Sequence, residues 1–440
     1  MSTEVLLKNI VAAILTEAKQ LGADSAEVSA TISNGFSVQV RKAEVETLEY
    51  HDDKGFSVTV YCGQSQGSAS TTDTRFEAIK STVLAAYNIA KYTQPDPDAG
   101  LAEQELMAFN YPNLDLYYPW AIKPEMAIEL AIACETRGLQ ADKRITNSDG
   151  VSISTQTSFS AYGNTHGFIG IYPSTYHEIN SVLIASMKGD MQRDNSYSVA
   201  RDPNELWDIN FIADQAVERT LSRLQPQTLS TRAAPVIFIN EVARGLLGHF
   251  VSAIRGASLY RKSSLYYEKL GHTIFPTWFN LYEQPHLLKA IGSTPFDADG
   301  LATSEKFFIE KGVLTNYALG TYSARKLGMK STGNADGTHN LSLITPKETF
   351  NSLLKKMDTG LLVTELMGQG INITTGDYSR GASGFWVEKG IIQYPVHQIT
   401  IAGNLRDMFA NIVAVADDVD VRGNIRTGSI LIENMMIAGK

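Results

Sequence analysis

A pattern of helix, alternating strands and helix occurs twice in the first half of the chain and restricts the fold more than any other feature. The segment 5–23 places apolar residues at helical spacing and ends at Gly22. Several segments between residues 26 and 70 then alternate apolar and polar residues with period two, and glycine or aspartate turns separate them. A second helix is expected over 73–92. The same order returns between Pro124 and residue 224, so the sequence predicts two related subdomains with antiparallel strands.

The second half of the chain shows mainly strand signals. Two matching hairpins, FFIEKGVLTNYAL at 307–319 and FWVEKGIIQYPV at 385–396, place Glu-Lys-Gly at the turn between strands. A capping box from Thr345 to Glu348 predicts the start of a helix that ends at Gly360. We therefore expect an α+β fold, in which two related helix–antiparallel-strands–helix subdomains (1–118 and 119–226) precede a β-rich, barrel-like domain (234–440).

The charge balance and the length of the apolar stretches restrict where the chain can be located and what it can bind. It has 440 residues with 38 positive and 47 negative side chains, and no basic run suited to nucleic acid or anionic lipid. Apolar stretches fall short of the roughly 20 residues that span a bilayer. The early run IVAAIL is followed at once by Glu17 and Lys19, which favours a helix over a signal peptide. With Cys62 and Cys134 read as free thiols, we expect a cytoplasmic protein.

The stretch EVARGLLGHFVSAIRGAS (241–258) follows the apolar run PVIFIN and contains a single histidine. A short strand leading into such a helix is the setting of a metallopeptidase zinc helix. That helix needs a second ligand near the first and a glutamate that activates water. Here Arg244 and Gly245 stand where those residues would be, and only His249 remains.

Four long stretches then resemble one family. GQGINITTGDYSRGASGFWVEKG, YPVHQITIAGNLRDM, ILIENMMIAGK and ARGLLGHFVSAIRGASLYRKSS are similar to the TldD/PmbA family, and most similar to its PmbA (TldE) branch. The resemblance implies a subunit of a cytoplasmic heteromeric metallopeptidase that acts on unfolded or small peptides and matures or degrades peptide antibiotics and antitoxins. In the TldD branch the helix carries HExxxH, and a cysteine near the C-terminus completes the zinc site.

Carried over residue by residue, the resemblance implies a degenerate zinc site. The last histidine falls on His249, the first on Arg244, the glutamate on Gly245, and the cysteine near Arg422 and Gly423. No cysteine follows residue 134. Arginine repels a dication, and glycine has no side chain to act as a base. We therefore expect no metal in this chain and zinc in a TldD-like partner.

Other residues could build a different site. His249, His272 and Glu283 could form a rebuilt zinc site, although their spacing matches no ligand pattern. Asp297 and Asp299 in FDADG begin like a calcium loop but lack its remaining ligands, so a tight turn is favoured. A catalytic role for Ser379 or Ser383 beside Arg380 is disfavoured because no GxSxG elbow is present.

The glycine-dense segment suggests contact with a peptide or a partner. Unshielded backbone suits an extended peptide added as a strand, and the alternative is that the glycines only permit turns and bulges. We expect this segment to share a cavity with the helix 241–255 and the hairpin turns near 310 and 388, with Arg244 and Arg380 anchoring a carboxylate. The proposed contact residues are Gly368, Gly370, Gly376, Arg380, Gly381 and Gly384.

Three functions remain open from the sequence. The first is the non-metal subunit of a two-component peptidase, as a homodimer or a heterodimer with a TldD-like paralogue. The second is an autonomous homodimeric metallopeptidase with a divergent metal site. The third is a regulatory or binding protein without enzymatic activity, since older descriptions of the family mention gyrase modulation. The lack of basic clusters argues against direct contact with DNA.

Overall fold

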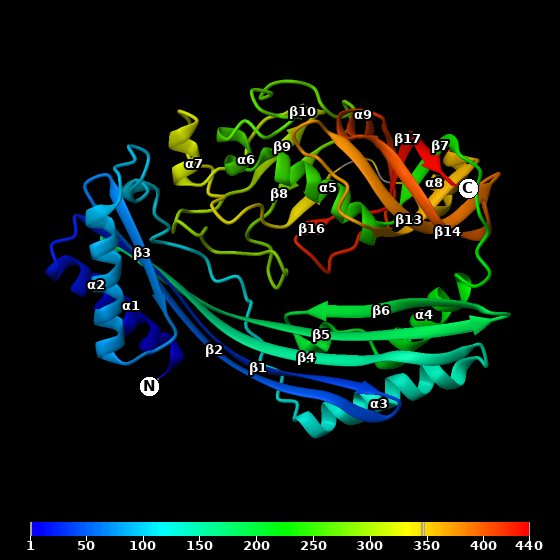
Figure 1. Ribbon diagram of the computed structural model, residues 1–440, viewed down its shortest axis with the longest axis horizontal. Helices are drawn as coiled ribbons and strands as arrows, with labels where there is room; N and C mark the ends of the chain where they lie inside the picture. The colour runs from blue at the N-terminus through cyan, green and yellow to red at the C-terminus, as the bar shows by residue number, and fades with distance from the viewer. Residues whose placement is uncertain (1, 345, 347, 440) are drawn as a thin grey trace.

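The computed structural model describes residues 2–344, 346 and 348–439, which form two facing layers (Figure 1). One layer is a long, curved antiparallel sheet with helices at both ends. The other is the β-rich region that follows residue 231 and lies above the sheet in Figure 1. The α+β class and the barrel-like second half agree with the prediction from sequence.

The long sheet is continuous across the two predicted subdomains. Its strand order is β3-β2-β1-β4-β5-β6, and β1 pairs with both β2 and β4. The proposed boundary at residue 118 therefore lies in the connection between two halves of one sheet. Strands before and after residue 226 belong to different sheets. The strands are β1 (Ser25–Arg41), β2 (Glu44–Cys62), β3 (Ser65–Thr71), β4 (Ile145–Asn164), β5 (Ile169–Met187) and β6 (Asp190–Ala200).

Two pairs of helices cover the same face of this sheet, one pair at each end. Side chains alternate along a strand, so the even-numbered residues of β1 share a face. Val28 and Ile32 are buried with the first pair of helices, and Val38 and Val40 with the second pair. The helices are α1 (Thr3–Gln20), α2 (Phe76–Tyr92), α3 (Pro124–Ala141) and α4 (Ile209–Ser222).

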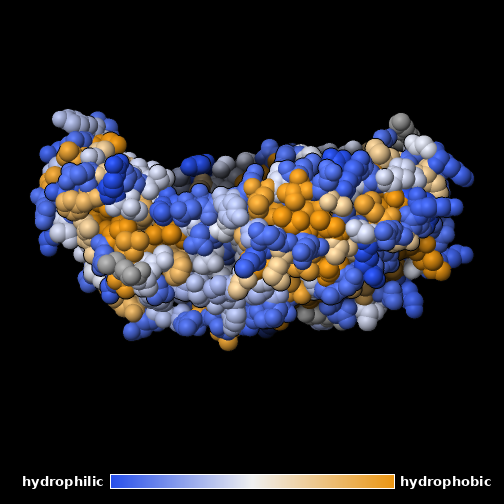
Figure 2. Space-filling view, turned by 90° about the horizontal axis from the view of Figure 1, so that it is seen from below, coloured by the Kyte–Doolittle hydropathy of each residue, from blue (hydrophilic) through white to orange (hydrophobic). Residues whose placement is uncertain are grey.

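The helix-covered face leaves some apolar surface exposed. Seen from below, apolar residues gather at the end with α1 and α2 and again near α3 (Figure 2). Exposed side chains on these elements include Val5 on α1, Met126 on α3, and Leu48 and Tyr50 on β2. β3 pairs only with Phe56–Cys62, so the first half of β2 is a free edge.

An apolar cluster joins the sheet to the β-rich region. Tyr162 and Phe168 pack with Phe296 and with Met107, which lies in the connection between α2 and α3. The rings of Phe168 and Phe296 meet edge to face, with centroids 5.4 Å apart. This contact fixes the sheet against the second layer. Two short 3-10 helices, η1 (Gln104–Leu106) and η2 (Pro203–Glu205), lie in the connecting segments.

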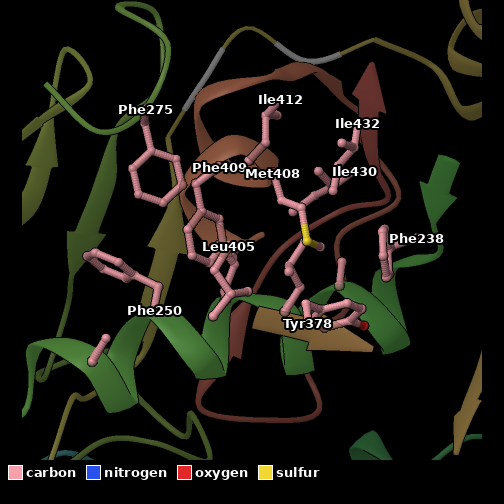
Figure 3. Close-up of a cluster of buried hydrophobic side chains, with 14 of the residues drawn as sticks. Phe238, Phe250, Phe275, Tyr378, Leu405, Met408, Phe409, Ile412, Ile430 and Ile432 are labelled. Atoms are coloured by element: carbon pink, nitrogen blue, oxygen red, sulfur yellow. The ribbon is translucent and has the colours of Figure 1, made fainter. Parts of the chain in front are cut away.

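The main sheet of the β-rich region closes on itself. Its order is β14-β13-β12-β7-β17-β15, and β14 also pairs with β17. Inside, Phe238, Phe409 and Ile432 share a core with Phe250 (Figure 3). The strands are β7 (Arg232–Phe238), β12 (Gly360–Met367), β13 (Asp377–Glu388), β14 (Ile391–Asn404), β15 (Ile412–Val415) and β17 (Ile430–Ala438).

A smaller sheet, in the order β10-β9-β8-β11-β16, completes this region. Both predicted hairpins are present, and Lys311, Gly312, Lys389 and Gly390 at their turns have positive φ, as tight two-residue turns require. The strands are β8 (Leu281–Glu283), β9 (Lys306–Glu310), β10 (Val313–Leu314), β11 (Leu341–Leu343) and β16 (Ile425–Arg426). The helices are α5 (Asn240–Ile254), α6 (Gly256–Tyr260), α7 (Thr321–Lys326), α8 (Phe350–Met357) and α9 (Leu405–Ala410).

The predicted capping box is wrong about where its helix begins. α8 begins at Phe350, and the Thr349 hydroxyl accepts the capping hydrogen bond from Ser352 N at 3.2 Å. Thr345 and Lys347 lie outside the described residues. Among the helices that the structure describes, none is both long enough and apolar enough to cross a membrane.

Candidate functional site

Helix α5 packs against the barrel core with one side, and the side that faces away from the core is lined by glycines. Leu246, Leu247 and Phe250 are buried in the core. On the other side Gly245 is exposed, and no atom lies within 4 Å of the position that its Cβ would take. The helix thus combines a packed apolar side with an open surface.

A groove of about 410 Å³ lies over this open surface. Its lining includes Gly245 and Gly248 from α5, Asp336 from the loop before β11, and Gly423 from the loop before β16. A Cβ on Gly423 would lie 2.8 Å from Nη1 of Arg244. The structure therefore places Arg244, Gly245 and the segment at Gly423 around one groove.

A network of paired charges lies beside the groove. Arg422 donates to Oε1 of Glu241 at 2.6 Å and to Oδ1 of Asp420 at 2.9 Å. Arg219 donates to the same Glu241 oxygen at 2.8 Å. Nη1 of Arg244 lies 3.5 Å from Oδ2 of Asp420. Three guanidinium groups thus share two carboxylates.

Tyrosine and tryptophan rings hold the arginines in place. Arg244 donates to the hydroxyl of Tyr197 at 2.7 Å, and the guanidinium of Arg422 lies 4.1 Å from the centre of the Tyr197 ring. Trp207 lies on the same guanidinium at 4.8 Å. These cation–π contacts stabilise a positive charge that is partly withdrawn from water.

The pKa values agree with a fully charged network. Burial alone would raise the pKa values of Glu241 and Asp420, but the bonds from the arginines outweigh burial and lower both. Burial would lower the pKa of Arg422, and its two carboxylate partners raise it instead. A Zn²⁺ ion needs ligand atoms that carry no proton, and a guanidinium group stays protonated, so it cannot act as a ligand. The side chains at this position do not fit a zinc ion.

His249 lies apart from the other degenerate positions. It lies five positions after Arg244, a step that corresponds to roughly 140° around the helix. Its ring packs against Tyr378 with centroids 6.0 Å apart, and it is not among the residues that line the groove. Burial, and then the charge of Arg380, lower the pKa of His249, which favours the neutral ring. Three of the four predicted positions come together, and His249 does not join them.

The alternative zinc site of His249, His272 and Glu283 is not formed. Across residues 2–344, 346 and 348–439, no three His, Cys, Asp or Glu side chains lie close enough to hold a metal. Glu283 is fully buried and accepts hydrogen bonds from Lys306 at 2.7 Å and Asn334 at 2.8 Å.

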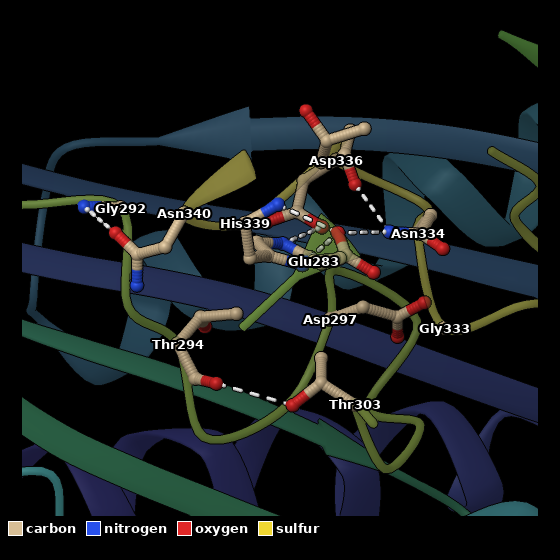
Figure 4. Close-up of polar contacts among 12 residues, drawn as sticks. Glu283, Gly292, Thr294, Asp297, Thr303, Gly333, Asn334, Asp336, His339 and Asn340 are labelled. Atoms are coloured by element: carbon tan, nitrogen blue, oxygen red, sulfur yellow. Dashed lines mark hydrogen bonds and ion pairs between the residues drawn. The ribbon is translucent and has the colours of Figure 1, made fainter. Parts of the chain in front are cut away.

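His339 completes this buried polar cluster (Figure 4). Its backbone N–H donates to Glu283 at 2.6 Å, and its Nε2 lies 3.1 Å from Oδ1 of Asp336, a residue of the groove. Burial alone would lower the pKa of His339. Its contacts with Asp336 and Glu283 outweigh burial and raise the pKa to about 9. These contacts favour the protonated ring of His339.

The FDADG segment forms the expected tight turn. Oδ1 of Asp297 accepts from the backbone N–H groups of Asp299 and Leu301, and Gly300 has a φ of 76°. Burial, reinforced by the charge of Asp299, raises the pKa of Asp297 to about 7. Its Oδ1 is bound to the turn's own backbone, and its Oδ2 accepts from the backbone N–H of Ala335 at 3.1 Å.

The proposed peptide-contact residues lie on and beside β12 and β13, and none of them is among the residues that line the groove over α5. A Cβ on Gly370 would overlap Ser379 O, and one on Gly384 would overlap Leu362 O. Gly368 and Gly376 have φ values of 81° and 89°, which glycine adopts most easily. Gly381 has ordinary contacts only, with Met367 Cβ 3.4 Å away. Gly370 and Gly384 thus satisfy close approaches within the chain, and Gly368 and Gly376 satisfy positive φ.

Ser383 has a histidine partner that the sequence did not indicate. Its hydroxyl lies 2.8 Å from Nδ1 of His397 on the neighbouring strand β14. Ser383 is 4% exposed, and in the described part of the chain no carboxylate contacts His397. The pair lacks both the access and the orienting acid of a catalytic serine.

Models of the PmbA/TldA metallopeptidase family match almost the whole chain. Domain 1 matches residues 26–90, the central domain 117–224 and the C-terminal domain 231–439. The chain belongs to the PmbA/TldD family. It is 51% identical to "Metalloprotease PmbA" of Escherichia coli O157:H7, over 95% of this chain and 93% of that protein. It is 47% identical to the PmbA homolog of Haemophilus influenzae, over 98% and 96% of the two chains.

These identities place the chain in the PmbA branch. The TldD homolog of Haemophilus influenzae is 22% identical over 90% of this chain and 86% of its own. A Bacteroides thetaiotaomicron protein described as a candidate modulator of DNA gyrase has 27% identity and a TM-score of 0.92, covering 98% and 99% of the chains. TldE from Thermococcus kodakarensis has 19% identity and a TM-score of 0.85, covering 99% and 100%, and shares the fold.

In this PmbA-branch chain, sequence reasoning missed the partners of the arginines. Glu241 comes from α5 and Tyr197 from β6, and only the fold brings them to Arg422 and Arg244. Asp420 lies beside Arg422 in the loop before β16. The one local signal was Asp420, which lies two residues before its partner Arg422. Nothing local indicated Glu241 or Tyr197.

Proposed function

We propose that this chain is the PmbA/TldE-type, non-metal subunit of a heteromeric cytoplasmic metallopeptidase that acts on unfolded and small peptides. A TldD-like paralogue supplies the zinc. The observation that carries this proposal is the charge network formed by Arg219, Glu241, Arg422, Asp420 and Arg244. A catalytic chain would need zinc ligands and a general base at this place, and here arginine and carboxylate side chains are paired with one another.

The groove over α5 supports a role in holding substrate or partner. Gly245 and Gly248 leave its floor without side chains, so an extended backbone can approach the helix closely. Arg244 and Arg255 at its wall favour a carboxylate. A subunit with these features shapes the substrate chamber and leaves the chemistry to its partner.

Metal analysis separates this proposal from an autonomous metallopeptidase. The purified chain is expected to hold no stoichiometric zinc after exposure to zinc and gel filtration, and His249→Ala should not change that result. About one tightly held zinc per chain, lost in His249→Ala, would contradict the proposal and favour a divergent metal site.

Reconstitution tests the role of the chain in peptide cleavage. An unfolded peptide should be cleaved only when this chain and a TldD-like paralogue are mixed. Arg244→Ala should lower turnover in the mixture. Arg137→Ala is the matched control, because Arg137 forms an exposed ion pair with Asp214 and does not line the groove. Equal turnover by the paralogue alone would show that this chain is not a subunit of the peptidase.

A further inference from the structure

A second cavity, of about 300 Å³, lies where the long sheet meets the start of α7. Glu27 and Tyr61 enter it from β1 and β2. Asp299 and Thr321 enter it from the β-rich region, and Tyr322 lies at its rim. Its walls therefore come from both layers of the molecule. It is separate from the groove over α5.

Two carboxylates in this cavity form no ion pair with any residue that the structure describes. Glu27 accepts hydrogen bonds from the hydroxyls of Tyr61 and Tyr162, each at 2.7 Å. Asp299 accepts one from the backbone N–H of Thr321 at 2.7 Å. The lining includes no lysine or arginine. Burial and the charge of Asp299 raise the pKa of Glu27, although the tyrosine hydroxyls oppose that rise.

The guanidinium group of Arg325, which bonds Gly100 in the cavity wall, has other carbonyl and carboxylate partners as well. Arg325 donates to Gly100 O at 3.2 Å, to Leu101 O at 2.6 Å and to Oε1 of Glu103 at 3.1 Å. It anchors the connecting segment to α7 and does not line the cavity. The two carboxylates therefore remain available to a cationic ligand, whose charge would stabilise the ionised form of Glu27 against the burial that raises its pKa.

A further polar group in the cavity, the hydroxyl of Thr321, lacks a hydrogen-bond partner in the described part of the chain. Thr321 is 5% exposed, and its hydroxyl oxygen is buried without a hydrogen bond to any described residue. Buried hydroxyl groups are nearly always hydrogen-bonded, because leaving one unpaired costs free energy. This orphaned hydroxyl is a second observation, independent of the carboxylates, that points to a missing ligand.

We propose that this cavity binds a primary ammonium group of a peptide, either the N-terminal ammonium or a lysine side chain. An ammonium group has three N–H donors and no acceptor, which matches Glu27, Asp299 and the hydroxyl of Thr321. The cavity is about ten times the roughly 30 Å³ that one water molecule occupies. It has room for the residue that carries the ammonium group as well as for the charge itself.

A third cavity, of about 220 Å³, leads from this site toward α5. It shares Asp299, Thr321 and Tyr322 with the ammonium site and Arg255 with the groove. A peptide held by its ammonium group at Glu27 could therefore continue to the groove, where Arg244 and Arg255 are cationic. In this respect the inference rests on the proposed function, because it takes the ligand to be a peptide substrate.

Calorimetric titration of the full chain with an eight-residue unstructured peptide tests the site. The peptide is prepared in three forms: a free N-terminus without lysine, an acetylated N-terminus with one lysine, and an acetylated N-terminus without lysine. At least one of the first two should bind at least tenfold more tightly than the third, since a charge-assisted hydrogen bond contributes about that much. The tighter of the two identifies the source of the ammonium group.

Three substitutions assign that binding to the cavity. Glu27→Gln removes the charge but keeps the size and can still accept from Tyr61, and it should weaken binding at least tenfold. Thr321→Val removes only the hydroxyl and should weaken it severalfold. Glu305→Gln is the control, because Glu305 accepts from the Tyr282 hydroxyl at 2.8 Å outside this cavity, and it should change nothing. Unchanged melting temperatures show that each variant is folded.

Three results would overturn the proposal. They are equal binding of all three peptides, unchanged binding by Glu27→Gln, and saturable binding of Na⁺ or Ca²⁺ alone that Glu27→Gln abolishes. Binding is measured on the isolated chain, whereas the proposed function is tested by turnover with the paralogue. A failure of one can thus be told from a failure of the other.

Discussion

Arg422 shows how single residues decide what this site can do. One guanidinium group neutralises parts of two carboxylates, Glu241 and Asp420, and lies on the rings of Tyr197 and Trp207. Removing a metal ligand from a catalytic helix would leave an empty pocket, whereas here the arginines provide a different and self-consistent set of contacts. The same residues that do not fit a zinc ion therefore hold α5, β6 and the loop before β16 together.

Arg422→Met should destabilise the protein strongly. The substitution leaves two poorly exposed carboxylates with fewer cationic partners, and breaking a buried pair in this way typically costs about 3–5 kcal/mol. Thermal unfolding followed by circular dichroism measures the effect. Arg137→Met is the control, because its ion pair with Asp214 is exposed and should contribute little. Equal melting temperatures for the two variants would mean that the network carries no stability.

His339 should make stability fall at alkaline pH. Its pKa is raised to about 9 from an ordinary value of 6.5, so the folded state binds its proton more tightly than the unfolded state does. This contribution, on the order of 1–3 kcal/mol, is fully present below pH 6.5 and is lost as the pH rises through 9.

Melting temperatures between pH 6 and 10 check this expectation. The difference between wild type and His339→Gln should shrink as the pH rises. His272→Gln removes an exposed histidine and should leave the pH profile unchanged. A difference for His339→Gln that stays constant with pH would contradict the assigned cause.

At the scale of elements, local signals in the sequence determined most of what could be predicted. Period-two alternation located the strand segments of β1 to β6, and Lys-Gly pairs located both hairpin turns. The turns expected at glycine and aspartate were wrong at Gly35 and at Asp52–Gly55, which lie inside the continuous strands β1 and β2 because each pairs in register with its neighbour. The start of α8 was missed because Thr349, four residues after the predicted cap, makes the capping bond. The pairing of β1 with β4 and the charge network could not be predicted, because their partners are far apart in sequence.

The glycines on β13 give a matched pair of variants. A Cβ on Gly384 would overlap Leu362 O on β12, so Gly384→Ala should destabilise the barrel by about 1–3 kcal/mol. Gly381→Ala has room, with Met367 Cβ 3.4 Å away, and should be nearly neutral. Denaturant unfolding measures both. If Gly384→Ala keeps full stability but loses peptide turnover with the paralogue, the glycine serves the peptide and not the barrel.

At the scale of the whole molecule, the first 226 residues are organised around one sheet. β1 is buried by α1 and α2 over its first half and by α3 and α4 over its second half. It also pairs with β4 from the second helix–strand–helix unit. The proposed units at 1–118 and 119–226 therefore depend on each other for the burial of one strand.

Fragments of the chain test this dependence. A fragment of residues 1–118 should lack cooperative unfolding, since Val38 and Val40 lose the helices that bury them. A fragment of residues 1–226 keeps all six strands and should show a β-rich circular dichroism spectrum and a cooperative thermal transition. A cooperative transition in the shorter fragment would show that the first unit is an independent domain.

Closure of the barrel also determines when, during synthesis, the chain can complete its folding. β7 ends at Phe238, but its neighbour β17 begins only at Ile430. A ribosome that adds 5–20 residues per second needs roughly 10–40 s to cover that distance. During this time β7 has an unsatisfied edge and Phe238 lacks part of its core, so the nascent chain is at its most prone to aggregation. Cells that make this protein quickly or at high temperature should therefore depend on chaperones that hold unfinished chains.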